Sequence, residues 1–294
     1  MQGERREGLI LKGIGGFYYV KTADAVLECR AKGILRRRGI TPLAGDIAEF
    51  EGDESGFVIS NILARENFFV RPPIANVGCF VLVVSSIDPR PNLQVLDELC
   101  AVACHCGVEP VIALTKTDLS PATDAERIYS GVGFETVDVR RDQRLAHERI
   151  CELARGRIAV FVGNSGVGKS TLINELLPQL SLETGETSKK LGRGRHTTRA
   201  VELYELGDGY LADTPGFSSL DIVQSSPIPK KNLAACFPDI ERHAQGCRYT
   251  GCSHTVEKDC AVLAALARGE IEKSRHESYC AMYDRAAESA SHYR

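Results

Sequence analysis

The sequence lacks a long apolar run, an excess of positive charge and any internal repeat. No hydrophobic stretch approaches the roughly 20 residues that a helix needs to span a bilayer. Residues 1–7 are charged with no apolar stretch behind them, which is unlike a secretory signal. The formal net charge is −3, so any contact with nucleic acid must come from local basic patches. We therefore expect a cytoplasmic protein with no membrane partner.

The sequence also lacks the cysteine pattern of a disulfide-stapled protein, although it holds 11 cysteines. The number is odd, and a chain of 294 residues can bury cores without disulfides. Cys79, Cys100 and Cys104 lie in apolar stretches, where a reduced thiol packs as a small hydrophobic group. In a reducing compartment the cysteines are best interpreted as core thiols plus one metal cluster.

The first part of the chain contains short strand-like stretches separated by glycine turns. They lie at residues 9–11, 17–20, 25–29, 46–50 and 57–59. Five short strands in this length are typical of an oligonucleotide-binding (OB) barrel, so we predict an RNA-binding OB-fold β-barrel at residues 1–67. Lys32, Arg36, Arg37 and Arg38 lie between the third and fourth strands. They form either a solvated loop or a contact to RNA phosphates.

Apolar strands then alternate with helices. We expect strands at 80–84, 111–114, 134–137 and 158–162, and helices near 93–106, 124–130 and 143–154. This alternation is typical of a parallel sheet covered by helices on both faces, and it predicts an α/β domain at residues 68–222. Residues 225–229 look like a linker, and the polar, cysteine-bearing remainder predicts a helical module at residues 223–294.

A phosphate loop is the strongest motif. It follows a predicted strand and opens a predicted helix, so its glycines and the helix N-terminus would present backbone N–H groups to phosphate oxygens. Lys169 would reach the β- and γ-phosphates, and the Ser170 hydroxyl would bind Mg²⁺. The residues of the motif are Gly163, Asn164, Ser165, Gly166, Val167, Gly168, Lys169, Ser170 and Thr171.

A guanine-reading motif precedes the phosphate loop, which reverses the usual order. Thr115, Lys116, Thr117 and Asp118 match the pattern [N/T]-K-x-D at the end of a predicted strand. Asp118 can accept hydrogen bonds from N1–H and the 2-amino group of guanine, which adenine does not offer together. Thr115 replaces asparagine, and we expect this to weaken the bracing between loops more than the choice of base. The two motifs together predict binding of GTP and GDP.

Two switch segments complete the expected nucleotide site. Asp213 and Gly216, in Asp-Thr-Pro-Gly, would hold Mg²⁺ and sense the γ-phosphate. The basic, glycine-interrupted stretch 189–199 is interpreted as the first switch, with Thr197 or Thr198 as the Mg²⁺-binding threonine.

One catalytic group is missing from the second switch. Phe217 stands where Ras-like enzymes use glutamine to orient the attacking water. His196 is the nearest replacement, although a histidine in such a loop is more often merely exposed. A GTP hydrolase with this gap predicts slow intrinsic turnover and activation by a partner, with catalytic candidates Lys169, His196, Thr197 and Thr198.

A cysteine–histidine cluster lies in the last part of the chain. Cys247, Cys252, His254 and Cys260 match the ligand set of a closed, structural Zn²⁺ site. Basic residues near it and on the following helices suggest a docking surface for RNA or protein. They are Arg242, His243, Arg248, Arg268, Lys273, Arg275 and Arg285.

With its motifs in this order, the chain resembles the circularly permuted, small-subunit-dependent ribosomal GTPase A family of bacteria along nearly its whole length. The resemblance implies an OB-fold barrel, a permuted α/β P-loop GTPase domain and a C-terminal α-helical zinc module. It also implies GTP hydrolysis in late maturation of the small (30S) ribosomal subunit, stimulated by that subunit and involving contact with its rRNA. A monomer is expected.

One stretch departs from the family pattern. Such proteins usually have a Ser-Ala type turn whose backbone contacts the guanine oxygen, whereas this chain has Val-Asp-Val-Arg-Arg at residues 137–141. A backbone contact needs no particular side chain, so no site residue is assigned there.

Other functions remain open. One is an RNA-binding assembly module whose nucleotide site is regulatory. Another is an assembly GTPase of the large ribosomal subunit, against which the flanking barrel and zinc cluster argue. A metabolic ATP-dependent kinase would leave Asp118 without a purpose.

Overall fold

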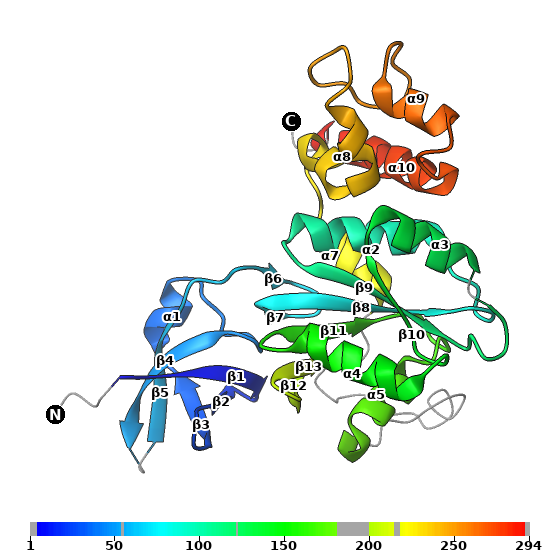
Figure 1. Cartoon of the computed structure of the whole chain (residues 1–294). Coiled ribbons are helices and arrows are strands. Elements are labelled where there is room, and N and C mark those ends of the chain that lie inside the picture. Colours follow the sequence, from blue (N-terminus) through cyan, green and yellow to red (C-terminus); the bar gives the residue numbers. More distant parts are fainter. Residues whose placement is uncertain (1–4, 54–55, 122, 181–199, 215–217, 292–294) are drawn as a thin grey trace. The chain divides into compact units, whose positions relative to one another are not determined.

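The computed structural model describes residues 5–53, 56–121, 123–180, 200–214 and 218–291 (Figure 1). The chain divides into two compact units, each assembled from segments that are far apart in the sequence. The first unit comprises the described parts of Met1–Cys79, Glu148–Phe161 and Ser170–Ser218. The second comprises those of Phe80–His147, Val162–Lys169 and Ser219–Arg294.

The N-terminal barrel of the first unit confirms the predicted five strands (Figure 1). Their order is β1-β2-β3-β5-β4, and β1 also pairs with β4, which closes the barrel. Alternate residues of the strands point inward, so Ile10, Val20, Phe50 and Ile59 are fully buried. The strands are β1 (Arg6–Ile14), β2 (Phe17–Lys21), β3 (Val26–Ala31), β4 (Ile47–Asp53) and β5 (Gly56–Ile62).

The basic segment of the barrel is helical, and its exposed arginines leave both expected alternatives open, solvation or a contact to RNA phosphates. It forms the short helix α1 (Gly33–Arg37), because Leu35 turns inward and is fully buried in the barrel core. The backbone N–H of Lys32 also donates to Ile59 O at 2.9 Å, which fixes the start of the helix. Arg36, Arg37 and Arg38 are left exposed on the outer side of this turn.

Three further strands of the first unit continue the barrel sheet in the order β11-β13-β12-β1. β12 was not predicted; it lies antiparallel beside β1, with Glu202 opposite Lys12. Ion pairs reinforce this edge, from Lys12 to Glu202 at 2.5 Å and from Lys21 to Glu205 at 2.8 Å. The strands are β11 (Ile158–Val162), β12 (Glu202–Leu206) and β13 (Gly209–Asp213), and a separate pair is formed by β6 (Phe68–Phe69) and β7 (Ile74–Ala75).

The second unit contains the strand order β10-β9-β8, with β9 and β10 parallel as predicted. β8 is buried along almost its whole length, which agrees with a continuous apolar run. The strands are β8 (Val77–Ser85), β9 (Glu109–Thr115) and β10 (Glu135–Asp138). The second unit also contains the helices α2 (Leu93–His105), α3 (Thr123–Val132) and α7 (Ser219–Ser225). Helix α4 (Gln143–Ala154) is divided between the two units, and α5 (Lys169–Leu176) after its first residue and the 3₁₀ turn η1 (Pro178–Leu180) belong to the first unit.

A helical module ends the second unit, and its helix α10 packs against α2. Arg275 of α10 does not belong to an exposed docking surface, so that prediction is wrong for this residue. Its side chain is 1% exposed because it bonds Asp97 of α2 and Asp239 of α8. The elements are η2 (Lys230–Asn232), η3 (Ala234–Cys236), α8 (Pro238–Ala244), α9 (Ala261–Ala267) and α10 (Lys273–Ser291).

Among the residues that the structure describes, no helix combines the length and the apolar character needed to cross a membrane.

Candidate functional site

The phosphate loop lies between β11 and α5, the strand–loop–helix context that its chemistry requires. Its first glycine approaches the backbone of β8 so closely that a Cβ at Gly163 would lie 2.8 Å from Val83 O. Gly168 has a φ of +95°, which side-chain-bearing residues rarely adopt. Both positions therefore require glycine for the path of the loop.

The guanine-reading motif and the phosphate loop are brought together in the second unit. Thr115 ends β9 and is 2% exposed, and its hydroxyl donates to Val167 O of the phosphate loop at 2.5 Å. We expected threonine to weaken this bracing relative to asparagine. The Thr115 hydroxyl does brace the two loops, because it lies directly beside the phosphate loop, next to Gly168. A bracing weaker than that by asparagine stays a prediction.

The backbone of Lys116 is held in an uncommon conformation. Its φ is +58°, in the left-handed region that few residues other than glycine occupy. Two contacts fix it: Ser86 Oγ donates to Lys116 O at 2.7 Å, and the Lys116 ammonium donates to Asp88 O. Such conformations persist where the surroundings determine them, and they cluster at ligand sites.

A carboxylate that the sequence interpretation missed joins the guanine-reading motif to the turn after β10. Thr117 Oγ1 donates to Asp138 Oδ1 at 2.5 Å, and the backbone N–H groups of Arg140 and Arg141 donate to the same oxygen at 3.1 Å each. The available signal was an aspartate directly after a predicted strand, where it can accept from the next backbone amides.

A cavity of about 40 Å³ lies beside the phosphate loop, between β8, α2 and α7. Its lining includes Val83, Leu96, Asn164, Val167 and Ser219. The Ser219 hydroxyl donates weakly to Asn164 Oδ1 at 3.4 Å, which links α7 to the phosphate loop. A space of this size holds a few water molecules and is too small for a nucleotide.

The expected switch residues fall largely outside the described residues. Asp213 is described: it is the last residue of β13, which runs parallel to β11 with Ala212 opposite Val160. It therefore lies at the carboxyl edge of that strand pair, the edge where ligands of parallel sheets bind. The other candidates, which lie outside the described parts of the chain, are His196, Thr197, Thr198, Gly216 and Phe217.

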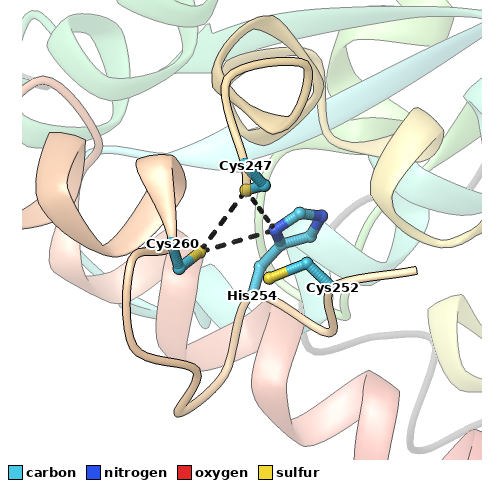
Figure 2. Close-up of side chains that lie close together, drawn as sticks. All are labelled: Cys247, Cys252, His254 and Cys260. Carbon is cyan, nitrogen blue, oxygen red and sulfur yellow. Dashed lines mark hydrogen bonds between the residues drawn. The ribbon is translucent and has the colours of Figure 1, made fainter. Parts of the chain in front are cut away.

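A candidate metal centre lies in the helical module (Figure 2). The ligand atoms of Cys247, Cys252, His254 and Cys260 all lie within 4.8 Å of one another. Cys247 Sγ lies 3.7 Å from Cys260 Sγ and 3.4 Å from His254 Nδ1. Bond lengths to tetrahedral zinc imply about 3.8 Å between two thiolates and about 3.6 Å between sulfur and nitrogen. The donor set and its spacing fit such an ion.

The loop that carries His254 is held from two sides. Glu257 accepts from the backbone N–H groups of Ser253 at 2.8 Å and Thr255 at 3.1 Å. Burial alone would raise the pKa of Glu257, but hydrogen bonds from Ser253 and neighbouring amides lower it to about 2. From α10, Tyr279 donates its hydroxyl to Ser253 O at 2.9 Å.

Helix α10 also contacts the ligand-bearing residue itself. His276 Nε2 lies 2.8 Å from His254 O, in a loop where His254 has a φ of +60°. Burial lowers the pKa of His254, which favours the neutral imidazole that can bind a metal. The loop of this candidate metal centre is therefore held by side chains of α10.

These features define a class of protein. A base-reading motif that precedes a phosphate loop in the sequence, together with an N-terminal barrel, is the arrangement of a circularly permuted P-loop GTPase. The RsgA GTPase family model matches residues 62–223, and the RsgA N-terminal domain model matches residues 7–58. The chain belongs to the RsgA GTPase family and is a GTP-hydrolysing enzyme.

Relatives and solved structures match nearly the whole chain. The small ribosomal subunit biogenesis GTPase RsgA 2 of Listeria monocytogenes is 42% identical, covering 93% of this chain and 94% of its own. RsgA of a Geobacillus species is 39% identical, and the match covers 98% of this chain and 99% of the relative. The circularly permuted GTPase YloQ has a TM-score of 0.78 at 32% identity, covering 97% and 96%. YjeQ from Thermotoga maritima has a TM-score of 0.80 and is 28% identical in sequence, and the match covers 97% of this chain and 99% of YjeQ.

Proposed function

We propose that this enzyme hydrolyses GTP during late maturation of the small (30S) ribosomal subunit, and that the subunit stimulates hydrolysis. The carrying observation is that relatives matching 93% or more of the chain bear the name small ribosomal subunit biogenesis GTPase. The exposed Arg36, Arg37 and Arg38 on the barrel support a contact with rRNA phosphates. The enzyme acts as a monomer in the cytoplasm, where the small subunit is assembled.

The residue roles in this proposal follow P-loop chemistry. Asp118 accepts from N1–H and the 2-amino group of guanine. Backbone N–H groups of the phosphate loop and Lys169 hold the β- and γ-phosphates, where negative charge develops as the γ-phosphate leaves. Ser170 and Asp213, with Thr197 or Thr198, would hold Mg²⁺, which when bound offsets charge on the β- and γ-phosphates.

The enzyme lacks the glutamine that orients the attacking water in Ras-like GTPases. The Phe217 side chain has no hydrogen-bonding group, so we assign the orienting role to His196 of the first switch when the subunit is bound. Gly216 would sense the γ-phosphate through its backbone N–H. This division of roles makes efficient hydrolysis dependent on the subunit.

The four-residue cluster holds one structural Zn²⁺ in this proposal. Three thiolates and one imidazole fill a tetrahedral shell and leave no position for a reacting water. Cys247, Cys252, His254 and Cys260 therefore stabilise the helical module and take no part in hydrolysis.

Hydrolysis should depend on the small subunit. We expect slow GTP turnover by the full chain alone and a rise of at least about tenfold with purified small subunits, because partners that complete a GTPase site contribute up to about 10⁵-fold. The measurement is phosphate release with small subunits, with large subunits and with neither, corrected for the Lys169→Ala variant. Equal stimulation by large subunits, or none by small ones, would refute the proposed function.

Changing the base-reading carboxylate should change the preferred base. In Asp118→Asn, an amide N–H₂ would face the 2-amino group of guanine but could donate to the 2-oxo group of xanthine. We expect the ratio of GDP to XDP affinity to fall by about 100-fold or more. Asp124→Asn, at an exposed position of α3, is the matched control and should keep the normal ratio. An unchanged ratio in Asp118→Asn would rule out this base-reading role.

A further inference from the structure

The carboxylate of Asp138 connects two segments that leave the same edge of the sheet. β9 and β10 are parallel, with Asp138 opposite Leu114. The base-reading motif starts one residue after Leu114, and the turn at residues 139–141 starts directly after Asp138. Directly before the motif, the backbone N–H of Val139 in the turn donates to Leu114 O at 2.9 Å.

The side chain of Asp138 adds further bonds at this junction. One oxygen, Oδ1, accepts from the Thr117 hydroxyl at 2.5 Å and from the Arg140 and Arg141 amides at 3.1 Å. The other oxygen, Oδ2, lies 3.5 Å from Arg141 Nε. The Asp138 side chain is 12% exposed, and its bonds from Thr117 and the Arg140 amide are partly buried.

We propose that Asp138 is a positioning residue for guanine recognition, fixing the base-reading motif and the turn after β10 as one rigid base pocket. Thr117 is the immediate neighbour of Asp118, so a bond that holds Thr117 limits how far Asp118 can move. The same oxygen directs the Arg140 and Arg141 amides. The proposal rests on the base-reading role of Asp118 in the proposed function.

A carboxylate suits this position better than a hydroxyl or an amide. It is an acceptor only, with room for several donors on each oxygen, so it can serve a hydroxyl and two amides at once. Its bonds are charge-assisted and are therefore about twice as strong as those of a neutral acceptor. An asparagine can keep the same acceptor oxygen, whereas an alanine loses every bond.

Nucleotide binding by full-length variants tests the proposal. The dissociation constant and dissociation rate of a fluorescent methylanthraniloyl-GDP are measured for Asp138→Ala, Asp138→Asn and Thr117→Val. We expect Asp138→Ala to weaken GDP binding about tenfold through faster dissociation, and Asp138→Asn to weaken it no more than about threefold. Thr117→Val should show part of this loss of GDP affinity. The double variant with Asp138→Ala and Thr117→Val should lose less binding free energy than the two single variants added together.

Two controls separate positioning from general damage. Asp142 is a matched residue: it also accepts from a backbone amide, Leu145 N at 3.1 Å, but it is exposed and lies just before α4. Asp142→Ala should bind GDP normally. Competition by pyrophosphate, which reports the phosphate loop alone, should be unchanged in Asp138→Ala.

The outcomes distinguish this inference from the proposed function. If Asp118→Ala fails to weaken GDP binding, the base-reading assignment itself is wrong. If Asp118→Ala weakens GDP binding but Asp138→Ala binds GDP like Asp142→Ala, only the positioning role of Asp138 is overturned. Parallel losses of GDP binding and pyrophosphate competition in Asp138→Ala would also overturn it, because they would indicate a purely structural role.

Discussion

Replacing Arg275 with alanine is expected to lower the free energy of unfolding by about 3–5 kcal/mol, because it leaves two buried carboxylates without their cation. Arg275 Nε and Nη2 bond the two oxygens of Asp239 at 2.7 and 2.8 Å, and Nη1 bonds Asp97 at 2.8 Å. The exposed fractions of the side chains are 1%, 7% and 0% for Arg275, Asp239 and Asp97. Water cannot replace these bonds without opening the packing of α2 against α10.

The environment of Arg275 explains why it stays charged inside the protein. Burial acts to lower the pKa of Arg275, but the hydrogen bonds and charge of Asp239 outweigh it and raise that pKa. Burial raises the pKa of Asp97 even though Arg275 acts to lower it. The two directions are compatible, because the arginine has two carboxylate partners while Asp97 receives only one cation.

The stability loss should depend on pH. Without Arg275, the pKa of buried Asp97 would rise further above its unfolded value, so the folded state would bind a proton more readily than the unfolded state. Stability of the variant should then increase as pH falls towards the unfolded pKa. We expect a smaller deficit at about pH 5 than at about pH 8. Urea unfolding of the parent chain and of Arg275→Ala at both pH values measures this difference in the free energy of unfolding.

A second arginine of the same module provides the control. Arg268 also makes a two-pronged pair, with Glu270 at 2.6 and 2.9 Å, but it is 57% exposed. Exposed pairs contribute about 0–1 kcal/mol, so Arg268→Ala should unfold almost like the parent chain. Equal effects of the two variants would contradict the importance of burial. A loss below about 1 kcal/mol in Arg275→Ala would refute the prediction.

The burial of Arg275 also marks a limit of the sequence interpretation. Lys273 and Arg275 look alike in a polar helix, yet Lys273 is exposed and Arg275 is buried. The difference depends on Asp97, which is 178 positions away, and no local pattern carries that information. Asp138 was missed for a related reason, because its role depends on a hydrogen bond from Thr117, which follows the neighbouring strand β9.

Features encoded within a few neighbouring residues were predictable. The barrel strands alternate inward and outward residues, and the phosphate loop combines required glycines with a strand and a helix. The cysteine–histidine cluster was predictable because its members lie within one short stretch of the chain. β12 was not, because its pairing with β1 joins Glu202 to Lys12 across most of the sequence.

Loss of one residue of the cysteine–histidine cluster should unfold the helical module more completely than Arg275→Ala does. We propose that Cys247, Cys252, His254 and Cys260 hold Zn²⁺, and apparent binding energies of structural zinc reach about 10–16 kcal/mol. Cys260→Ser is expected to retain little zinc by elemental analysis, against one equivalent in the parent chain. Its C-terminal region should become sensitive to protease.

Cys280→Ser is the matched control for this loss. Cys280 is a half-buried thiol of the same module, 3.8 Å from His276 Nδ1, and lies outside the four-residue cluster. It should keep one zinc and resist protease. Because His276 and Tyr279 of α10 hold the loop of His254, a lost ligand should also loosen α10 and the Arg275 contact with α2. Cys260→Ser with full zinc content and normal protease resistance would contradict both the metal assignment and this route of destabilisation.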